Sequence, residues 1–259
     1  MLRTRVISAL ILLPFVLGSV YVGGLLFLAM VTLALLIGGW EFYDMTRRAG
    51  YRPMTGIGLA VIVLILLDTY WQTNWLRDII IGAAVVSLIL GIFFHDQDWL
   101  VGWALTQAGV LYVGIIGSYF ILVRALPNGL WLTALAMLAT WATDSGAYLA
   151  GTRLGRHGFF TRISPKKTWE GAIGGVLSAI VVTLVLGILI DMPIIHRLGF
   201  GLGIGIAATI GDLVESLLKR QTGVKDSSNL MPGHGGLLDR MDSLLFAAVF
   251  AYYYLMWMR

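Results

Sequence analysis

Residues 211–243 combine acidic, basic and glycine residues at spacings that suit binding of a metal ion and phosphate. Four polar residues recur at i, i+3, i+4 and i+7, the spacing of one helix face: Asp212, Glu215, Ser216 and Lys219. Asp239 and Asp242 are also three residues apart and share a face of the following segment. These two pairs of acidic residues resemble a hard-cation site, and oxygen ligands in a chain without cysteine favour magnesium over zinc.

The segment between these two acidic pairs is rich in charge and glycine. Its polar residues are Lys225, Asp226 and His234, and Gly233, Gly235 and Gly236 surround the histidine. Glycines allow positive φ and close approach of the backbone to a ligand, as in phosphate-binding loops. His234 suits a zinc ligand, a general base or a residue that shapes the backbone, and the sequence leaves these roles open.

Two further polar clusters precede this segment. "WATDSGAYLAG" (141–151) places Asp144 and Ser145 inside an apolar stretch, where an acidic residue either lines a polar cavity or hydrogen-bonds to a neighbouring helix. "RISPKKTWEGAIGG" (162–175) places Lys166 and Lys167 directly before a helix start. The two lysines suit a phosphate site and a simple topology signal equally well.

The elements that position these residues are membrane helices. The chain has 259 residues, of which 58% are hydrophobic and only 12% are charged, about half the charged fraction of a soluble domain. Its mean hydropathy is +0.86, and the apolar residues form runs long enough to cross a bilayer. The sequence therefore predicts an all-α, polytopic integral membrane protein. The absence of cysteine excludes disulfides, thiolate nucleophiles and thiolate metal sites.

The apolar runs predict about nine transmembrane helices, at 6–22, 24–45, 55–70, 78–94, 100–124, 129–151, 169–190, 197–218 and 241–257. With a cytoplasmic N-terminus, only Arg77, Arg124, Arg197 and Arg259 lie on the opposite side, which leaves 14 of the 18 Lys and Arg residues in cytoplasmic segments. This orientation makes 152–168 and 219–240 cytoplasmic loops.

Most other acidic residues lie at predicted span ends, where water can solvate them. Glu41 and Asp44 end the second span beside Arg47 and Arg48, and this arrangement predicts local ion pairs at the membrane interface.

The C-terminal motif resembles the signature of phosphatidate cytidylyltransferases (CDP-diacylglycerol synthases). The resemblance rests on the order and spacing of Ser216-Leu217-Leu218-Lys219-Arg220, Lys225-Asp226, Pro232-Gly233-His234-Gly235-Gly236 and Asp239-Arg240-Met241-Asp242. "DSGAYLAG" and "SPKKTWEG" are also similar to elements of that family. The resemblance covers the C-terminal half, and residues 1–130 show only compatible apolar spans.

This resemblance implies an enzyme of the bacterial inner membrane that faces the cytoplasm. It would convert CTP and phosphatidic acid into CDP-diacylglycerol and pyrophosphate with magnesium, and a second, for example monovalent, cation is compatible. It implies a homodimer among membrane lipids and no nucleic-acid partner. The whole chain, 1–259, would form a single transmembrane domain, with 1–130 as scaffold and dimer contacts and 131–259 as catalytic helices and loops.

Carried onto this chain, the resemblance implies metal ligands at Asp212, Asp239 and Asp242, with Glu215 as a further candidate. Lys219 and Asp144 would complete the catalytic group. The implied substrate-binding residues are Lys166, Lys167, Ser216, Arg220, Lys225, Asp226, His234, Gly235, Gly236 and Arg240.

Two other functions remain as alternatives. A transporter would use Asp144 and the Gly/Pro interruptions along a substrate pathway, but the two halves show no repeat. A CDP-alcohol phosphotransferase would require an Asp-Gly-x-x-Ala-Arg motif followed by further spaced aspartates, which the chain lacks. A purely structural membrane protein would leave the charged C-terminal cluster without a purpose.

Overall fold

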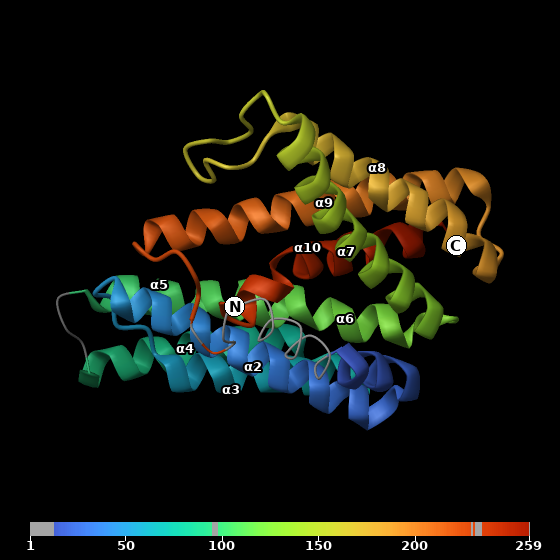
Figure 1. The fold of residues 1–259 in the computed structure, drawn as a ribbon. Coiled ribbons are helices and arrows are strands. Elements are labelled where there is room, and N and C mark those ends of the chain that lie inside the picture. Colours follow the sequence, from blue (N-terminus) through green and yellow to red (C-terminus); the bar gives the residue numbers. More distant parts are fainter. Residues whose placement is uncertain (1–12, 95–97, 229, 231–234, 259) are drawn as a thin grey trace. The chain divides into compact units, whose positions relative to one another are not determined.

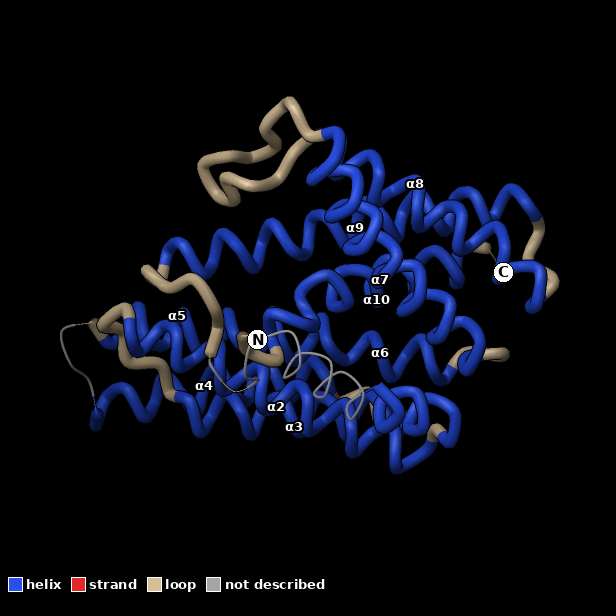
Figure 2. Tube along the Cα trace, viewed as in Figure 1, coloured by secondary structure: helices blue, strands red, loops and turns tan. Residues whose placement is uncertain are grey.

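A computed structural model describes residues 13–94, 98–228, 230 and 235–258 (Figure 1). The regular secondary structure of these residues is helical (Figure 2). The one β-bridge among them is the isolated pair Gly158 and Thr168. The predicted all-α fold is therefore confirmed.

Helical segments lie at each predicted apolar run. The described part of the first run is helical over Leu13–Val22. The others are α2 (Gly24–Arg48), α3 (Thr55–Trp71), α4 (Leu76–Phe94), α5 (Trp99–Gly109), η1 (Val110–Ile115), α6 (Ile116–Ala125), α7 (Gly129–Leu154), α8 (Trp169–Leu186), η2 (Gly187–Ile190), α9 (Ile194–Gln221) and α10 (Leu238–Trp257). The helices α5, η1 and α6 form one continuous run, because η1 is a π-helical turn between two α-helices.

Five of these segments have the length and apolar composition needed to cross a membrane. They are Gly24–Arg48, Leu76–Phe93, Trp99–Ala125, Trp169–Ile190 and Ile194–Gln221. Leu13–Val22 and Thr55–Trp71 are shorter apolar helices. The chain is therefore a helical membrane protein with at least this set of candidate spans among its described residues.

The chain divides into two compact units. The first unit contains Met1–Leu122 and Gln221–Asp239, and the second contains Val123–Arg220 and Arg240–Arg259. The connection between α9 and α10 therefore belongs with the N-terminal helices, although it lies near the C-terminus of the sequence.

Tyr43 of α2 is at the centre of the first unit. Its ring is fully buried, and its hydroxyl donates a hydrogen bond to the backbone oxygen of Thr106 at 2.9 Å. Gly109 leaves room for this ring, since a Cβ atom there would lie 2.6 Å from the Tyr43 hydroxyl. The ring thus links α2 with α5 just before the π-helical turn.

The second unit depends on close packing between α7 and α8. A Cβ atom on Gly175 of α8 would lie 2.8 Å from the backbone oxygen of Thr143 on α7. Gly146 and Gly174 likewise face the opposite helix without room for a side chain. Small residues of this kind let membrane helices approach closely, so that van der Waals contact holds them together. This contact positions the middle of α7, where Asp144 lies.

We expect Gly175→Val to lower the thermal stability of the protein in detergent. The new side chain would meet the Thr143 backbone, which cannot move aside, and overpacking of this kind costs about 1–3 kcal/mol. Gly82→Val is the matched control, because Gly82 of α4 has open space where its Cβ would lie. Equal melting temperatures for the two variants would contradict the proposed packing.

Candidate functional site

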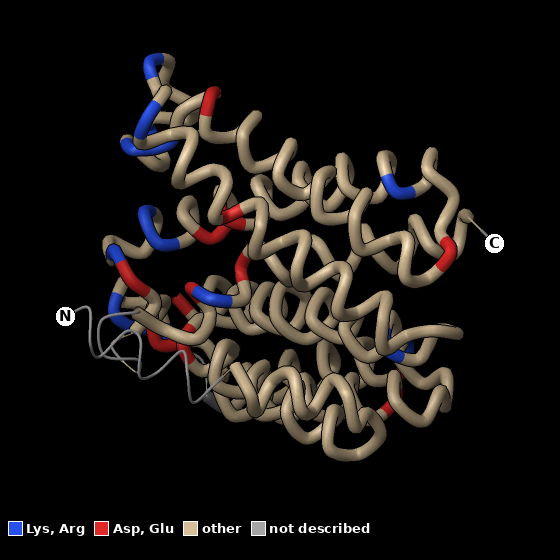
Figure 3. Tube along the Cα trace, turned by 45° about the vertical axis from the view of Figure 1, so that its right-hand side comes forward, with Lys and Arg blue, Asp and Glu red and all other residues tan. Residues whose placement is uncertain are grey.

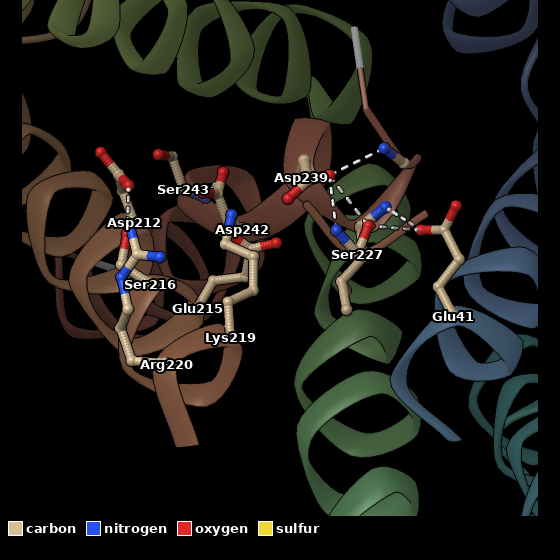
Figure 4. Close-up of polar contacts among 12 residues, drawn as sticks. Glu41, Asp212, Glu215, Ser216, Lys219, Arg220, Ser227, Asp239, Asp242 and Ser243 are labelled. Carbon is tan, nitrogen blue, oxygen red and sulfur yellow. Dashed lines mark hydrogen bonds and ion pairs between the residues drawn. The ribbon is translucent and has the colours of Figure 1, made fainter. Parts of the chain in front are cut away.

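The predicted polar face of residues 212–219 lies on α9, as the spacing indicated. Ser216 donates a hydrogen bond from its hydroxyl to Asp212 Oδ1 at 3.4 Å, one turn away (Figure 4). Glu215 is fully buried and forms an ion pair with Lys219 on the same helix. The predicted metal ligand Glu215 and the predicted catalytic Lys219 therefore neutralise each other in this structure.

Three aspartates from different helices lie near enough to one another in the second unit to interact electrostatically. Asp144 of α7, Asp212 of α9 and Asp242 of α10 interact electrostatically with one another. Gly211 allows this approach, because a side chain there would collide with the backbone oxygen of Asp242. We call these three aspartates the acidic cluster. Their mutual repulsion favours a cation among them.

Few neutral donors offset the charge of the acidic cluster. Ser243 donates from its hydroxyl to Asp144 Oδ1 at 3.3 Å and from its backbone nitrogen to Asp242 Oδ1 at 2.6 Å. Figure 4 shows Ser243 beside Asp242 at the start of α10. The main compensation at Asp212 is a positive charge, because Lys167 Nζ lies 2.8 Å from Asp212 Oδ2.

The connection between α7 and α8 holds Lys167 in place. Thr168 caps α8 by accepting a hydrogen bond from the backbone nitrogen of Gly171 at 3.1 Å. Glu170 accepts hydrogen bonds from the backbone nitrogens of Arg156 and His157 and pairs with the His157 ring at 2.6 Å. The side chain of Lys167 is only 20% exposed, so this connection brings a largely buried cation to the acidic cluster.

Other basic residues lie at the same end of the second unit. Arg220 donates from Nε to the backbone oxygen of Ile163 at 3.2 Å, which links the end of α9 to the α7–α8 connection. Arg240 is exposed and interacts electrostatically with Asp144. Lys166 is exposed on the α7–α8 connection. Figure 3 shows basic residues along this connection and at the end of α9. This end of the unit can therefore attract an anionic ligand.

Asp239 belongs to the first unit and has a different environment. Its Oδ2 atom accepts hydrogen bonds from the Ser227 backbone nitrogen at 3.0 Å, the Ser227 hydroxyl at 3.0 Å and the Gly236 backbone nitrogen at 2.7 Å. Gly235 has a φ of 77°, and a Cβ atom on it would lie 2.6 Å from the same carboxylate oxygen. The Asp239 carboxylate thus organises the connection that precedes it.

The chemistry of the acidic cluster fits a hard cation, but the structure holds no preassembled ligand set. Among the described residues, no three Asp, Glu or His side chains lie close enough to form a metal site. Asp212, Glu215 and Asp242 belong to the second unit and Asp239 to the first, and their role as metal ligands stays a prediction. The ammonium group of Lys167 balances the negative charge of Asp212.

The remaining predicted substrate ligands lie on the α9–α10 connection. Lys225 and Asp226 are exposed, whereas Gly236 is buried. A side chain on Gly236 would lie 2.6 Å from both carboxylate oxygens of Glu41, so the contacts of Gly235 and Gly236 are with protein carboxylates. Their predicted role as a phosphate cradle stays a prediction. His234 lies outside the described residues.

Glu41 is the residue whose environment the sequence analysis predicted wrongly. Asp44 forms the expected ion pairs with Arg47 at 3.3 Å and Arg48 at 2.6 Å. Glu41 is instead fully buried and accepts hydrogen bonds from the α9–α10 connection. One signal was present in the sequence: Glu41 lies one turn further inside an apolar helix than Asp44, away from the basic end.

We expect Lys219→Met to destabilise the protein by about 3–5 kcal/mol, because it leaves the Glu215 carboxylate buried without its ion-pair partner. The double variant Glu215→Gln/Lys219→Met removes both charges and should recover most of this loss. Thermal unfolding in detergent measures both effects. Arg220→Met, which removes an exposed positive charge from the next residue, is the control. If Lys219→Met and Glu215→Gln/Lys219→Met were equally stable, the ion pair between Glu215 and Lys219 would not be stabilising.

Comparison with known proteins identifies the family of this chain. The model of the cytidylyltransferase family matches residues 3–258. Phosphatidate cytidylyltransferase from Synechocystis sp. is 33% identical over 282 residues, covering 96% of this chain and 95% of the relative. The protein of the same name from Pseudomonas aeruginosa is 33% identical over 269 residues (99% and 97%), and that from Bacillus subtilis is 37% identical over 212 residues (77% of each). The chain therefore belongs to the cytidylyltransferase family.

Proposed function

We propose that this protein is a phosphatidate cytidylyltransferase, which converts CTP and phosphatidic acid into CDP-diacylglycerol and pyrophosphate. The family match and the names of the relatives support the reaction class. The observation that carries the mechanism is the acidic cluster on three helices of the second unit, in which Lys167 forms an ion pair with Asp212. Carboxylates beside cationic side chains suit a reaction between two phosphates, which needs charge compensation more than proton transfer.

In the proposed reaction, a phosphate oxygen of phosphatidic acid attacks the α-phosphorus of CTP. A new P–O bond forms as the bond to the departing pyrophosphate breaks in line with it. The attacking phosphate is already ionised at neutral pH, so no strong general base is required. The chain's own task is to bind two polyanions together and to neutralise their oxygens.

Lys167 is the best-supported phosphate ligand, because its side chain is only 20% exposed beside the cluster, where water screens its charge less than at the open surface. Arg220, Arg240 and Lys166 add positive charge around it. Asp212 and Asp242 would hold magnesium, with Asp144 in support. Magnesium would supply charge neutralisation and alignment of the triphosphate. The proposal has further parts. It includes a second cation, metal ligation by Asp239 and Glu215, and substrate contacts from His234, Ser216, Lys225 and Asp226.

We also propose nine transmembrane helices, a cytoplasmic N-terminus and a site that opens to the cytoplasm at the bacterial inner membrane. The nine apolar runs and the excess of Lys and Arg in 152–168 and 219–240 support this orientation. It lets CTP arrive from water and phosphatidic acid from the bilayer. A homodimer is proposed as well, and its mass in detergent tests it.

The purified protein in detergent, given phosphatidic acid, labelled CTP and magnesium, should release CDP-diacylglycerol and pyrophosphate in equal amounts. EDTA should abolish both products. A folded preparation that forms neither product would reject the cytidylyltransferase and favour the transporter.

In sealed membrane vesicles, CTP added outside should react in inverted vesicles and fail to react in right-side-out vesicles. The opposite pattern would reverse the proposed orientation.

A further inference from the structure

We propose that Glu41 is a positioning residue that fixes Ser227 and Ser228 beside the start of α10 and, through Ser227, the carboxylate of Asp239. This inference rests on the proposed function, because it concerns how one of the proposed metal ligands is oriented. All the residues that carry it belong to the first unit.

Glu41 accepts four hydrogen bonds from residues that lie nearly two hundred positions away in the sequence. Its Oε1 atom accepts from the Ser228 hydroxyl at 2.6 Å and the Leu237 backbone nitrogen at 3.0 Å. Its Oε2 atom accepts from the Ser227 hydroxyl at 3.1 Å and the Leu238 backbone nitrogen at 2.7 Å. The side chain is fully buried, so these donors replace the water that an exposed carboxylate would have.

Two of these donors are the backbone nitrogens at the start of α10. Leu238 is the first residue of that helix, and the first nitrogens of a helix have no acceptor within it. Glu41 supplies that acceptor from another helix, which fixes where α10 begins. Gly236 permits the close approach, since a Cβ atom there would collide with the Ser227 hydroxyl and lie 2.6 Å from Glu41.

Ser227 connects Glu41 to Asp239. Its hydroxyl lies 3.1 Å from Glu41 Oε2 and 3.0 Å from Asp239 Oδ2, and its backbone nitrogen donates to the same Asp239 oxygen (Figure 4). The hydroxyl has a single proton, so the two carboxylates share one donor, and its position is tied to both of them. The orientation of the Asp239 carboxylate therefore depends on Ser227, and the position of Ser227 depends on Glu41.

Hydrogen exchange of the backbone amides tests the anchor without any assay of activity. Glu41→Gln keeps the size of the side chain but replaces one acceptor oxygen with an NH₂ group that cannot accept. We expect exchange at Leu237 and Leu238 to become about tenfold faster or more, the effect of losing one charge-assisted hydrogen bond. Asp44→Asn is the control: it removes the same charge one turn away, where the carboxylate pairs with arginines, and should leave these amides unchanged.

A pair of serine variants tests the link to Asp239. Ser227→Ala and Ser228→Ala each remove a hydroxyl that donates to Glu41, but only the Ser227 hydroxyl also contacts Asp239. We expect kcat of Ser227→Ala to fall about tenfold further than that of Ser228→Ala. Glu41→Gln combined with Ser227→Ala should lower kcat by much less than the product of the two single effects.

Unchanged exchange in Glu41→Gln, or equal kcat values in the two serine variants, would overturn the proposal. The serine pair keeps the test decisive if Glu41→Gln does not fold. If Glu41→Gln speeds exchange and the wild-type protein forms no CDP-diacylglycerol, the anchor stands and the proposed function fails.

Discussion

Repulsion among Asp144, Asp212 and Asp242 is the constraint on which the second unit depends. Three carboxylates on three apolar helices are unfavourable unless positive charge is brought to them. Lys167 supplies this positive charge. The connection between α7 and α8 places its Nζ atom 2.8 Å from Asp212 Oδ2. The glycine contacts between α7 and α8, and the close approach of Gly211 to α10, bring the helices near enough for the carboxylates to interact electrostatically.

The acidic residues fall into two classes by the partners they receive. Four neutral donors lie at hydrogen-bond distance from Glu41 and three from Asp239 Oδ2, and the Ser227 hydroxyl is shared between the two carboxylates. Asp212 instead has a lysine and one long serine bond. Carboxylates surrounded by neutral donors hold a fold in place, whereas a carboxylate balanced by a lysine side chain can exchange that charge for a ligand. This contrast makes Asp212 the stronger candidate for direct contact with a cation.

Helix positions could be predicted from the sequence because apolar runs of bilayer length have no other stable conformation in a membrane. The α9 face from Asp212 to Lys219 followed from helical periodicity alone. The contact between Lys167 and Asp212 could not be predicted, since the 44 intervening residues carry no signal of how α8 and α9 bring these two side chains together. Glu41 was assigned to a local ion pair because basic residues were near in sequence, but its partners come from the α9–α10 connection.

The central claim is that Asp212 and Asp242 hold a divalent cation together with the triphosphate of CTP. Electron paramagnetic resonance with Mn²⁺ in place of magnesium measures this binding directly, on the whole protein in detergent with CTP. Wild type and Asp191→Asn should bind Mn²⁺ alike, because Asp191 is an exposed turn residue whose φ of 52° suits asparagine. Asp212→Asn and Asp242→Asn should lose the bound signal. Undiminished binding in both variants would contradict the account.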